Sequence, residues 1–153
     1  MLPMPCGRPR MPSGVVGSVS HKGPLAAALV AAGRDGIGVD VEHVDELDAT
    51  LERKVLTPGE RARLADTNRH LQLHAIVAHF SVKEAIYKSL ATERQRGLEF
   101  DDIDVNLASL REGEWIVSEA RVKTVTRPFR TAVLIDGQWI LAAARASCET
   151  LLP

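Results

Sequence analysis

The sequence predicts an α+β fold, because strand patterns and helix patterns occupy separate stretches of the chain. Residues 14–42 show strand patterns, residues 57–92 show helix patterns, and residues 103–146 return to strand patterns. The 153 residues are 45% hydrophobic and 25% charged, which is ordinary for a globular domain. A chain of this length buries enough surface to fold without a disulfide or a structural metal.

The first 36 residues combine a proline-rich arm with a predicted hairpin. Residues 1–13 are rich in proline and are expected to be extended. Valines after Gly14 indicate a strand that ends at the turn Lys22-Gly23-Pro24, and Leu25–Ala32 indicates its partner. A second turn signal at residues 33–36 separates this hairpin from the next strand.

Two helices are predicted in the middle of the chain. Thr57-Pro58-Gly59-Glu60 combines an N-cap threonine, a proline at the first helical position and a glutamate at the third, so a helix should begin there and run to about Asp66. A longer helix is predicted from His70 to about Thr92, because no glycine or proline interrupts it. Four strands are then predicted at residues 103–107, 115–122, 131–135 and 139–146. Asp136-Gly137 is a hairpin signal, so these strands should be antiparallel.

Composition excludes several classes of protein. The net charge of −1 argues against a general nucleic-acid binder or a protein of anionic membrane surfaces. The longest apolar run, Leu25–Ala32, is much shorter than the roughly 18 residues that a transmembrane segment needs. Cys6 and Cys148 lie near opposite ends and do not form a zinc pattern, which is consistent with a cytoplasmic protein.

Asp40 and Glu42 belong to a stretch that alternates strictly from Ile37 to Glu42, which predicts a half-buried strand. Residues two apart share one face of a strand, so these carboxylates should lie side by side, next to the bare backbone of Gly38. They are either part of a solvated outer face or a pair of oxygen ligands for a hard cation such as Mg²⁺.

Glu84 favours the second interpretation. At 100° per residue it falls inside a predicted apolar stripe on the long helix, which consists of Leu73, Ile76, Val77, Phe80 and Tyr87. A carboxylate on a buried face must be protonated, paired or bound to a cation, because desolvation of its charge is costly. A pair with Lys88 one turn later stabilises a helix by only a few tenths of a kcal/mol. We therefore expect a cation or a cleft on this face.

Ser20 and His21 end a predicted strand and enter a turn, where binding groups often gather. A lone histidine is also compatible with a structural role. A serine beside a histidine is no hydrolase triad without a third, orienting acid.

Together these residues resemble the signatures of the 4'-phosphopantetheinyl transferase superfamily. The strand signature is Gly38-Val39-Asp40-Val41-Glu42, and the helix signature is Phe80-Ser81-Val82-Lys83-Glu84-Ala85-Ile86-Tyr87-Lys88. The upstream Gly17-Ser18-Val19-Ser20-His21 resembles the longer, Sfp/EntD-like branch, which is similar to enterobactin synthetase component D. The resemblance covers roughly residues 7–145. It implies an antiparallel sheet packed against a long helix.

The resemblance implies transfer of 4'-phosphopantetheine from coenzyme A to a serine of an acyl or peptidyl carrier protein, with release of adenosine 3',5'-bisphosphate. It implies a Mg²⁺ ion, or Mn²⁺, held by Asp40, Glu42 and Glu84. Glu84 would also act as the base, and Lys88 would neutralise or protonate the leaving phosphate. The implied coenzyme A contacts are Ser20, His21, Lys83, Lys88, Arg8 and Arg10. Siderophore or other non-ribosomal peptide synthesis is the implied pathway.

The resemblance also implies a chain of two similar halves with the active site between them. Residues 37–147 would supply the second half, residues 1–36 a remnant of the first, and residues 148–153 a tail. The first half would then be largely missing, and we expect a truncated chain or a misplaced start codon. Such a chain should expose an apolar half-interface through which it could dimerise.

Two other functions remain open from the sequence. One is an inactive or weakly active relic that binds coenzyme A or a carrier protein without turnover. The other is a metal-dependent phosphodiesterase or nuclease, because similar acidic sites hold cleavage metals. The near-neutral net charge and the lack of a basic stripe count against nucleic acid as a partner.

Overall fold

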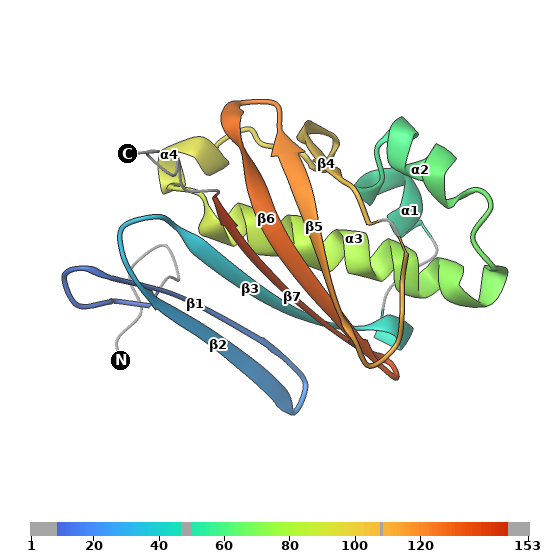
Figure 1. The fold of residues 1–153 in the computed structure, drawn as a ribbon, viewed down its shortest axis with the longest axis horizontal. Coiled ribbons are helices and arrows are strands. Elements are labelled where there is room, and N and C mark those ends of the chain that lie inside the picture. Colours follow the sequence, from blue (N-terminus) through green and yellow to red (C-terminus); the bar gives the residue numbers. More distant parts are fainter. Residues whose placement is uncertain (1–8, 47–49, 108, 147–153) are drawn as a thin grey trace, which may run out of the picture.

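The computed structural model describes residues 9–46, 50–107 and 109–146, with only the backbone of Arg69 and His70. The predicted tail, residues 148–153, lies outside the described residues. The α+β class is confirmed: two antiparallel sheets and one long helix make up most of the fold (Figure 1). No helix in the described part of the chain is long and apolar enough to cross a membrane.

The predicted hairpin forms a sheet of its own. Strands β1 (Val15–Lys22) and β2 (Leu25–Ala32) pair antiparallel, with Lys22 opposite Leu25. Gly23 in the turn has a φ of 51°, a left-handed conformation that glycine adopts without strain. The turn signal in the sequence therefore located this hairpin correctly.

The second sheet has five antiparallel strands in the order β3-β7-β6-β5-β4. Their bounds are β3 (Ile37–His43), β4 (Ile103–Val105), β5 (Trp115–Val122), β6 (Val125–Asp136) and β7 (Trp139–Ala146). Strand β6 begins six residues before the predicted strand, and its pairing with β5 carries it through Pro128. Strand β3 forms one edge, with only β7 beside it in the sheet.

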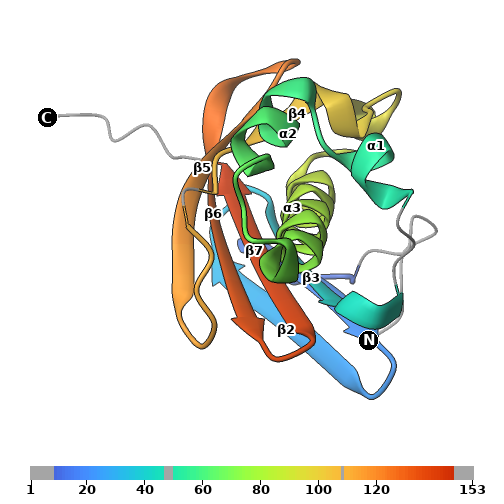
Figure 2. The same cartoon turned by 90° about the vertical axis from the view of Figure 1, so that its right-hand side faces the viewer.

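One face of the larger sheet is covered by helix α3 (Arg69–Ser89), and smaller helices cover the other side of α3 (Figure 2). These are α1 (Leu51–Val55) and α2 (Pro58–Leu64). The short helix α4 (Thr92–Gln95) follows the end of α3, and η1 (Val44–Glu46) and η2 (Phe100–Asp102) are 3-10 turns. The capping box at the start of α2 is confirmed, since Thr57 Oγ1 accepts from Glu60 N–H and Thr57 N–H donates to the Glu60 side chain. Helix α3 ends at Ser89, three residues before the predicted end.

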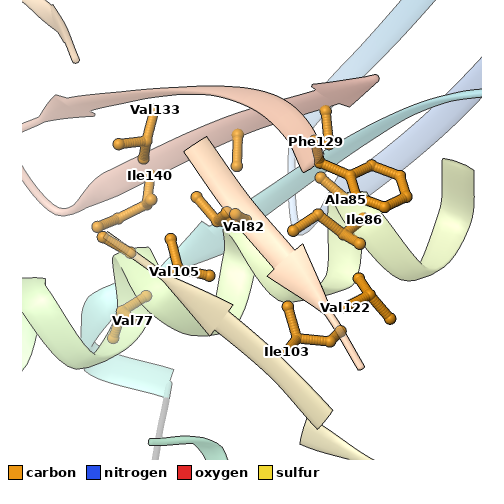
Figure 3. Packing of buried hydrophobic residues seen from close by; sticks show 14 of the residues in the cluster. Val77, Val82, Ala85, Ile86, Ile103, Val105, Val122, Phe129, Val133 and Ile140 are labelled. Atoms are coloured by element: carbon orange, nitrogen blue, oxygen red, sulfur yellow. The ribbon is translucent and has the colours of Figure 1, made fainter. Parts of the chain in front are cut away.

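The main core lies between α3 and the sheet (Figure 3). Val82, Ala85 and Ile86 of the helix meet Val133 and Ile140 of the sheet, and all five are buried. A second cluster between α3 and α1–α2 includes buried Val55, Leu56 and Ile76. The helix is therefore packed on two sides.

This two-sided packing shows that the predicted apolar stripe was only partly correct, since Ile76 and Val77 are buried but other members are not. Leu73 and Tyr87, which were placed in it, are each 37% exposed. The residues that face the sheet lie elsewhere on the helix, around Val82 and Ala85. Glu84 is consequently half-buried at the rim of the helix rather than inside an apolar face.

Strand β3 is also more buried than its alternating pattern predicted. Every residue from Ile37 to Glu42 is buried, because α3 covers one face and the hairpin packs against the strand from the other side. The outer face of the sheet still exposes Trp115 (52%) and Val117 (74%). That this face is the predicted apolar half-interface, and that the chain dimerises through it, both stay predictions.

Candidate active site

The contact between β3 and α3 builds the site. Gly36 and Gly38 face the helix, and a Cβ atom at either position would overlap a backbone carbonyl oxygen of α3, that of Ser89 or of Ala85. Glycine therefore lets strand and helix approach closely. The next residues on this face, Asp40 and Glu42, are carried to the same helix.

Asp40 is the best-connected carboxylate of the site, and it is only 3% exposed. Its Oδ1 accepts from Lys88 Nζ at 2.6 Å and from Ser20 Oγ at 3.1 Å, and its Oδ2 accepts from Ser81 Oγ at 2.9 Å. The long helix, the edge strand and the hairpin thus meet at one carboxylate. Hydrogen bonds to a charged acceptor are stronger than neutral ones, so this contact fixes all three elements.

Glu42 lies one strand position further on and forms an ion pair with Lys22, with Nζ 3.0 Å from Oε2. Burial raises the pKa of Glu42, the charge of Asp40 raises it further, and Lys22 and Lys88 oppose the shift. Its buried Oε2 accepts no well-aligned hydrogen bond from a described residue, although it lies beside the Lys22 ammonium. This oxygen retains capacity for a further ligand.

Glu84 belongs to the same electrostatic neighbourhood. Burial raises the pKa of Glu84, the charges of Asp40 and Glu42 raise it further, and Lys88 lowers it. Glu84 also lines a cavity of about 200 Å³, together with Tyr87, Leu98, Glu99 and Phe100. The three carboxylates predicted from the sequence therefore influence one another across the strand and the helix.

These carboxylates suit a hard divalent cation by their chemistry, because all their donor atoms are oxygen. Within the described ranges, no three carboxylate, imidazole or thiol groups are gathered closely enough to hold a metal by themselves. That is compatible with Mg²⁺, which commonly binds through one or two carboxylates and keeps water and phosphate oxygens as its other ligands.

Only some of the predicted coenzyme A contacts lie near the carboxylates. Ser20 touches Asp40 and Lys88, but His21 points to the opposite, exposed face of β1. Arg10 lines a cavity of about 280 Å³ with Gly17, Gly36 and Lys88. Arg8 lies outside the described residues.

Lys83 has a structural position that its motif did not predict. Its side chain is fully buried, and Nζ donates to Glu60 Oε2 at 2.7 Å, to the Val55 carbonyl at 2.6 Å and to the Phe100 carbonyl at 3.1 Å. Burial lowers the pKa of Lys83, and the ion pair with Glu60 opposes this shift. The contact with a coenzyme A phosphate stays a prediction, and it would require the ammonium to leave these acceptors.

Two site residues were missed by sequence reasoning. Ser81 lies seven residues before Lys88, which is about two helical turns, so both could have been assigned to one face. Lys22 lies two residues after Ser20 and shares its strand face. In both cases the spacing from a predicted site residue was the available signal.

Comparisons with known proteins place this site in a family. Residues 36–143 match the model of the 4'-phosphopantetheinyl transferase superfamily. Enterobactin synthase component D of Escherichia coli O157:H7 is 33% identical over 122 residues, which are 76% of this chain and 58% of that protein. Holo-[acyl-carrier-protein] synthase of Limosilactobacillus fermentum is 37% identical over 76 residues, which are 46% of this chain and 64% of that protein.

A solved structure shows the same fold. The holo-(acyl-carrier-protein) synthase of Bacillus anthracis, in complex with CoA (3',5'-ADP), aligns with a TM-score of 0.56 and 17% identity, covering 72% of this chain and 94% of that one. The chain spans a little more than half of the length of the component D relatives, whose similarity supports the predicted branch. Because the family model covers most of its residues and includes both signatures, this chain belongs to the 4'-phosphopantetheinyl transferase superfamily.

Proposed function

We propose that this chain transfers 4'-phosphopantetheine from coenzyme A to a serine hydroxyl of a carrier protein. The observation that supports this most is the meeting of Asp40, Glu42, Glu84 and Lys88 where β3 packs on α3. Carboxylates beside an ammonium suit in-line displacement at a pyrophosphate, where catalysis is mostly positioning and charge neutralisation. Family membership supports the same reaction.

Binding of coenzyme A would use the cavity that Arg10 and Lys88 line, because both cations attract phosphate groups. The uncharged pantetheine arm suits the cavity that Glu84 lines, where Tyr87 and Phe100 offer apolar surface. The pyrophosphate would then lie near the carboxylates, since Glu84 lines one of these cavities and Lys88, which contacts Asp40, lines the other.

Asp40, Glu42 and Glu84 would hold Mg²⁺, or Mn²⁺, which neutralises charge on the pyrophosphate when bound. Glu84, directly or through a water molecule, would take the proton of the attacking serine. A bound divalent cation would keep Glu84 ionised, which is the form that can accept this proton.

The bond changes in this reaction balance. The serine oxygen forms a bond to the phosphorus that carries the pantetheine arm, and the bond from that phosphorus to the bridging oxygen breaks. Adenosine 3',5'-bisphosphate leaves with the bridging oxygen. Lys88 would neutralise the charge that develops there, or protonate it.

The carrier protein that we propose is a domain of a siderophore or peptide synthetase. The argument is similarity: the match with enterobactin synthase component D extends over 76% of this chain, and that with the holo-synthase over 46%.

Intact-protein mass spectrometry tests the proposed function. The purified chain is incubated with coenzyme A, Mg²⁺ and either an apo acyl carrier protein or an apo peptidyl carrier domain. We expect one of the carriers to gain the mass of the phosphopantetheine arm, and no gain when its acceptor serine is replaced by alanine. Binding of coenzyme A without any modified carrier would instead support the inactive relic. Nicking of a plasmid would support the phosphodiesterase.

A further inference from the structure

The hairpin lies along β3 without extending the larger sheet (Figure 1). In the described part of the chain, no backbone hydrogen bonds join β1 to β3. The N–H groups of β3 that point away from β7 therefore do not donate to backbone carbonyls of β1. An unpaired N–H group inside a protein is costly. The N–H groups of β3 that face the hairpin therefore need acceptors from side chains.

Two serine hydroxyls are these acceptors. Val39 N–H donates to Ser18 Oγ at 3.1 Å, and Val41 N–H donates to Ser20 Oγ at 3.3 Å. The serines are two residues apart on β1, and the two N–H groups are two residues apart on β3. Both pairs thus match the period of a strand and flank Asp40. Side chains replace the backbone ladder that a neighbouring strand would provide.

The two serines differ in what else they touch. Ser20 also bonds Asp40 and Lys88, so a change there alters the carboxylate cluster directly. Ser18 is 6% exposed and bonds the backbone of Val39. Ser18 therefore offers a way to disturb the docking of the hairpin without removing a contact of the cluster.

Docking of the hairpin against β3 shapes the cavity that Arg10 lines. One wall comes from the hairpin and the arm before it, including Arg10 and Gly17, and the other comes from Gly36, Lys88 and Ser89. Met11 lies against Gly17, where a Cβ atom would come within 2.7 Å of its terminal carbon. A shift of β1 along β3 would therefore move one wall relative to the other.

We propose that Ser18 is a positioning residue for coenzyme A, which holds the hairpin in the register that forms this cavity. This proposal rests on the proposed function for the identity of the ligand. Its mechanism is an equilibrium between docked and displaced hairpins. A ligand that binds only the docked form binds more weakly in proportion to the docked fraction.

The test compares three variants of the full chain. Ser18→Ala removes the acceptor, Ser18→Thr keeps a hydroxyl at the same place in a residue that strands favour, and Ser118→Ala is the control. Ser118 bonds Thr131 on the larger sheet and does not belong to the hairpin. The readouts are hydrogen exchange at the Val39 amide by NMR, the dissociation constant of coenzyme A by calorimetry, and kcat and KM.

For Ser18→Ala we expect faster exchange at Val39 and a rise of about two- to tenfold in the dissociation constant and KM of coenzyme A, because the loss of one hydrogen bond lowers the docking equilibrium by about tenfold at most. We expect kcat at saturating coenzyme A to stay within about threefold of wild type, because the docked form is restored by the ligand. Ser18→Thr should restore exchange and affinity, and Ser118→Ala should alter neither.

Four outcomes overturn the proposal. Unchanged exchange at Val39 in Ser18→Ala means that the hydroxyl does not hold this edge. Faster exchange with unchanged affinity means that the bond is structural only. The same holds if Ser18→Thr restores slow exchange at Val39 but not the affinity for coenzyme A. A wild-type chain that binds no coenzyme A removes the assigned ligand. Exchange and binding need no turnover, so a chain that binds coenzyme A but modifies no carrier contradicts the proposed function alone.

Discussion

Lys88 Nζ lies 2.6 Å from Asp40 Oδ1 and 3.0 Å from Ser20 Oγ, so a single ammonium group joins the long helix, the edge strand and the hairpin. The side chain of Asp40 is 4% exposed and that of Lys88 is 29% exposed. Lys88 can therefore compensate a buried carboxylate and still face the neighbouring cavity. This double contact makes Lys88 the first residue to test.

Replacement of Lys88 by methionine should lower kcat by about 10²-fold or more, because the charge that we propose to stabilise the leaving phosphate is lost. The dissociation constant of coenzyme A should rise less than kcat falls, since Arg10 also lines the cavity. Stopped assays and calorimetry measure the two effects, and denaturation curves show whether the variant is folded. A weakened affinity with unchanged kcat would assign Lys88 to binding only.

Glu84→Gln should lower kcat by about 10²-fold, because the amide keeps the shape of the side chain but is neither an anion nor a base. Glu99→Gln is the matched control, since Glu99 lines the same cavity. Binding of Mn²⁺, followed by electron paramagnetic resonance, should weaken in Glu84→Gln and not in Glu99→Gln. Equal activity of the two variants would remove Glu84 from the proposed mechanism.

Lys83→Met should destabilise the fold by about 3–5 kcal/mol, because it leaves the fully buried carboxylate of Glu60 without its counter-charge. Glu60 would retain its bonds from the N–H groups of Thr57 and Val105. Adding Glu60→Gln removes the uncompensated charge and should recover part of the loss. Urea denaturation of the single and double variants measures both effects. A single variant as stable as wild type would contradict the structural role of Lys83.

The sequence predicted the elements whose signals are local. The turn at Gly23, the capping box from Thr57 to Glu60 and the hairpin signal at Gly137 each specify backbone geometry within four residues, and each is confirmed. Asp40 and Glu42 were assigned to one strand face from their spacing alone, and the structure carries this face to α3.

The sequence did not predict features that depend on several distant segments. A search for one apolar stripe misplaced Glu84, because α3 has a sheet on one side and small helices on the other. The motif predicts a ligand contact for Lys83, but the three acceptors of its ammonium group come from α1, α2 and η2. These partners are distant from Lys83 in the sequence, so only the tertiary structure brings them together.

His79 should make stability depend on pH. Its side chain is buried and Nδ1 lies 2.8 Å from the Ala75 carbonyl. Burial lowers the pKa of His79 below its ordinary 6.5; the Ala75 hydrogen bond and the charge of Glu60 oppose this, and Lys83 and Arg63 reinforce it. The unfolded chain therefore binds a proton below about pH 6.5 that the folded chain does not, so stability falls as pH decreases from there to the folded pKa.

The slope of this loss should approach about 1.4 kcal/mol per pH unit for the single proton. Urea denaturation of wild type and His79→Asn between pH 8 and pH 5 measures it. The variant has no imidazole at this position, so its stability should change less over the same interval. Parallel curves for the two proteins would show that other groups cause the acid loss.

Gly38→Ala tests the close contact on which the site depends. The new Cβ atom would overlap the carbonyl oxygen of Ala85, and backbone on both sides leaves no flexible side chain to move aside. We expect a loss of about 3 kcal/mol in stability, at the upper end for overpacking, because α3 must move away from β3.

The same displacement would separate Lys88 from Asp40, so kcat should fall even under conditions where the Gly38→Ala variant is fully folded. Gly59→Ala is the control, since its nearest atom outside the adjacent residues is the end of the Arg63 side chain at 3.5 Å and alanine favours the helix there. Denaturation midpoints and kcat of both variants measure the effects on stability and on the site. If Gly38→Ala folds and turns over like Gly59→Ala, the approach of strand to helix does not set the geometry of the site.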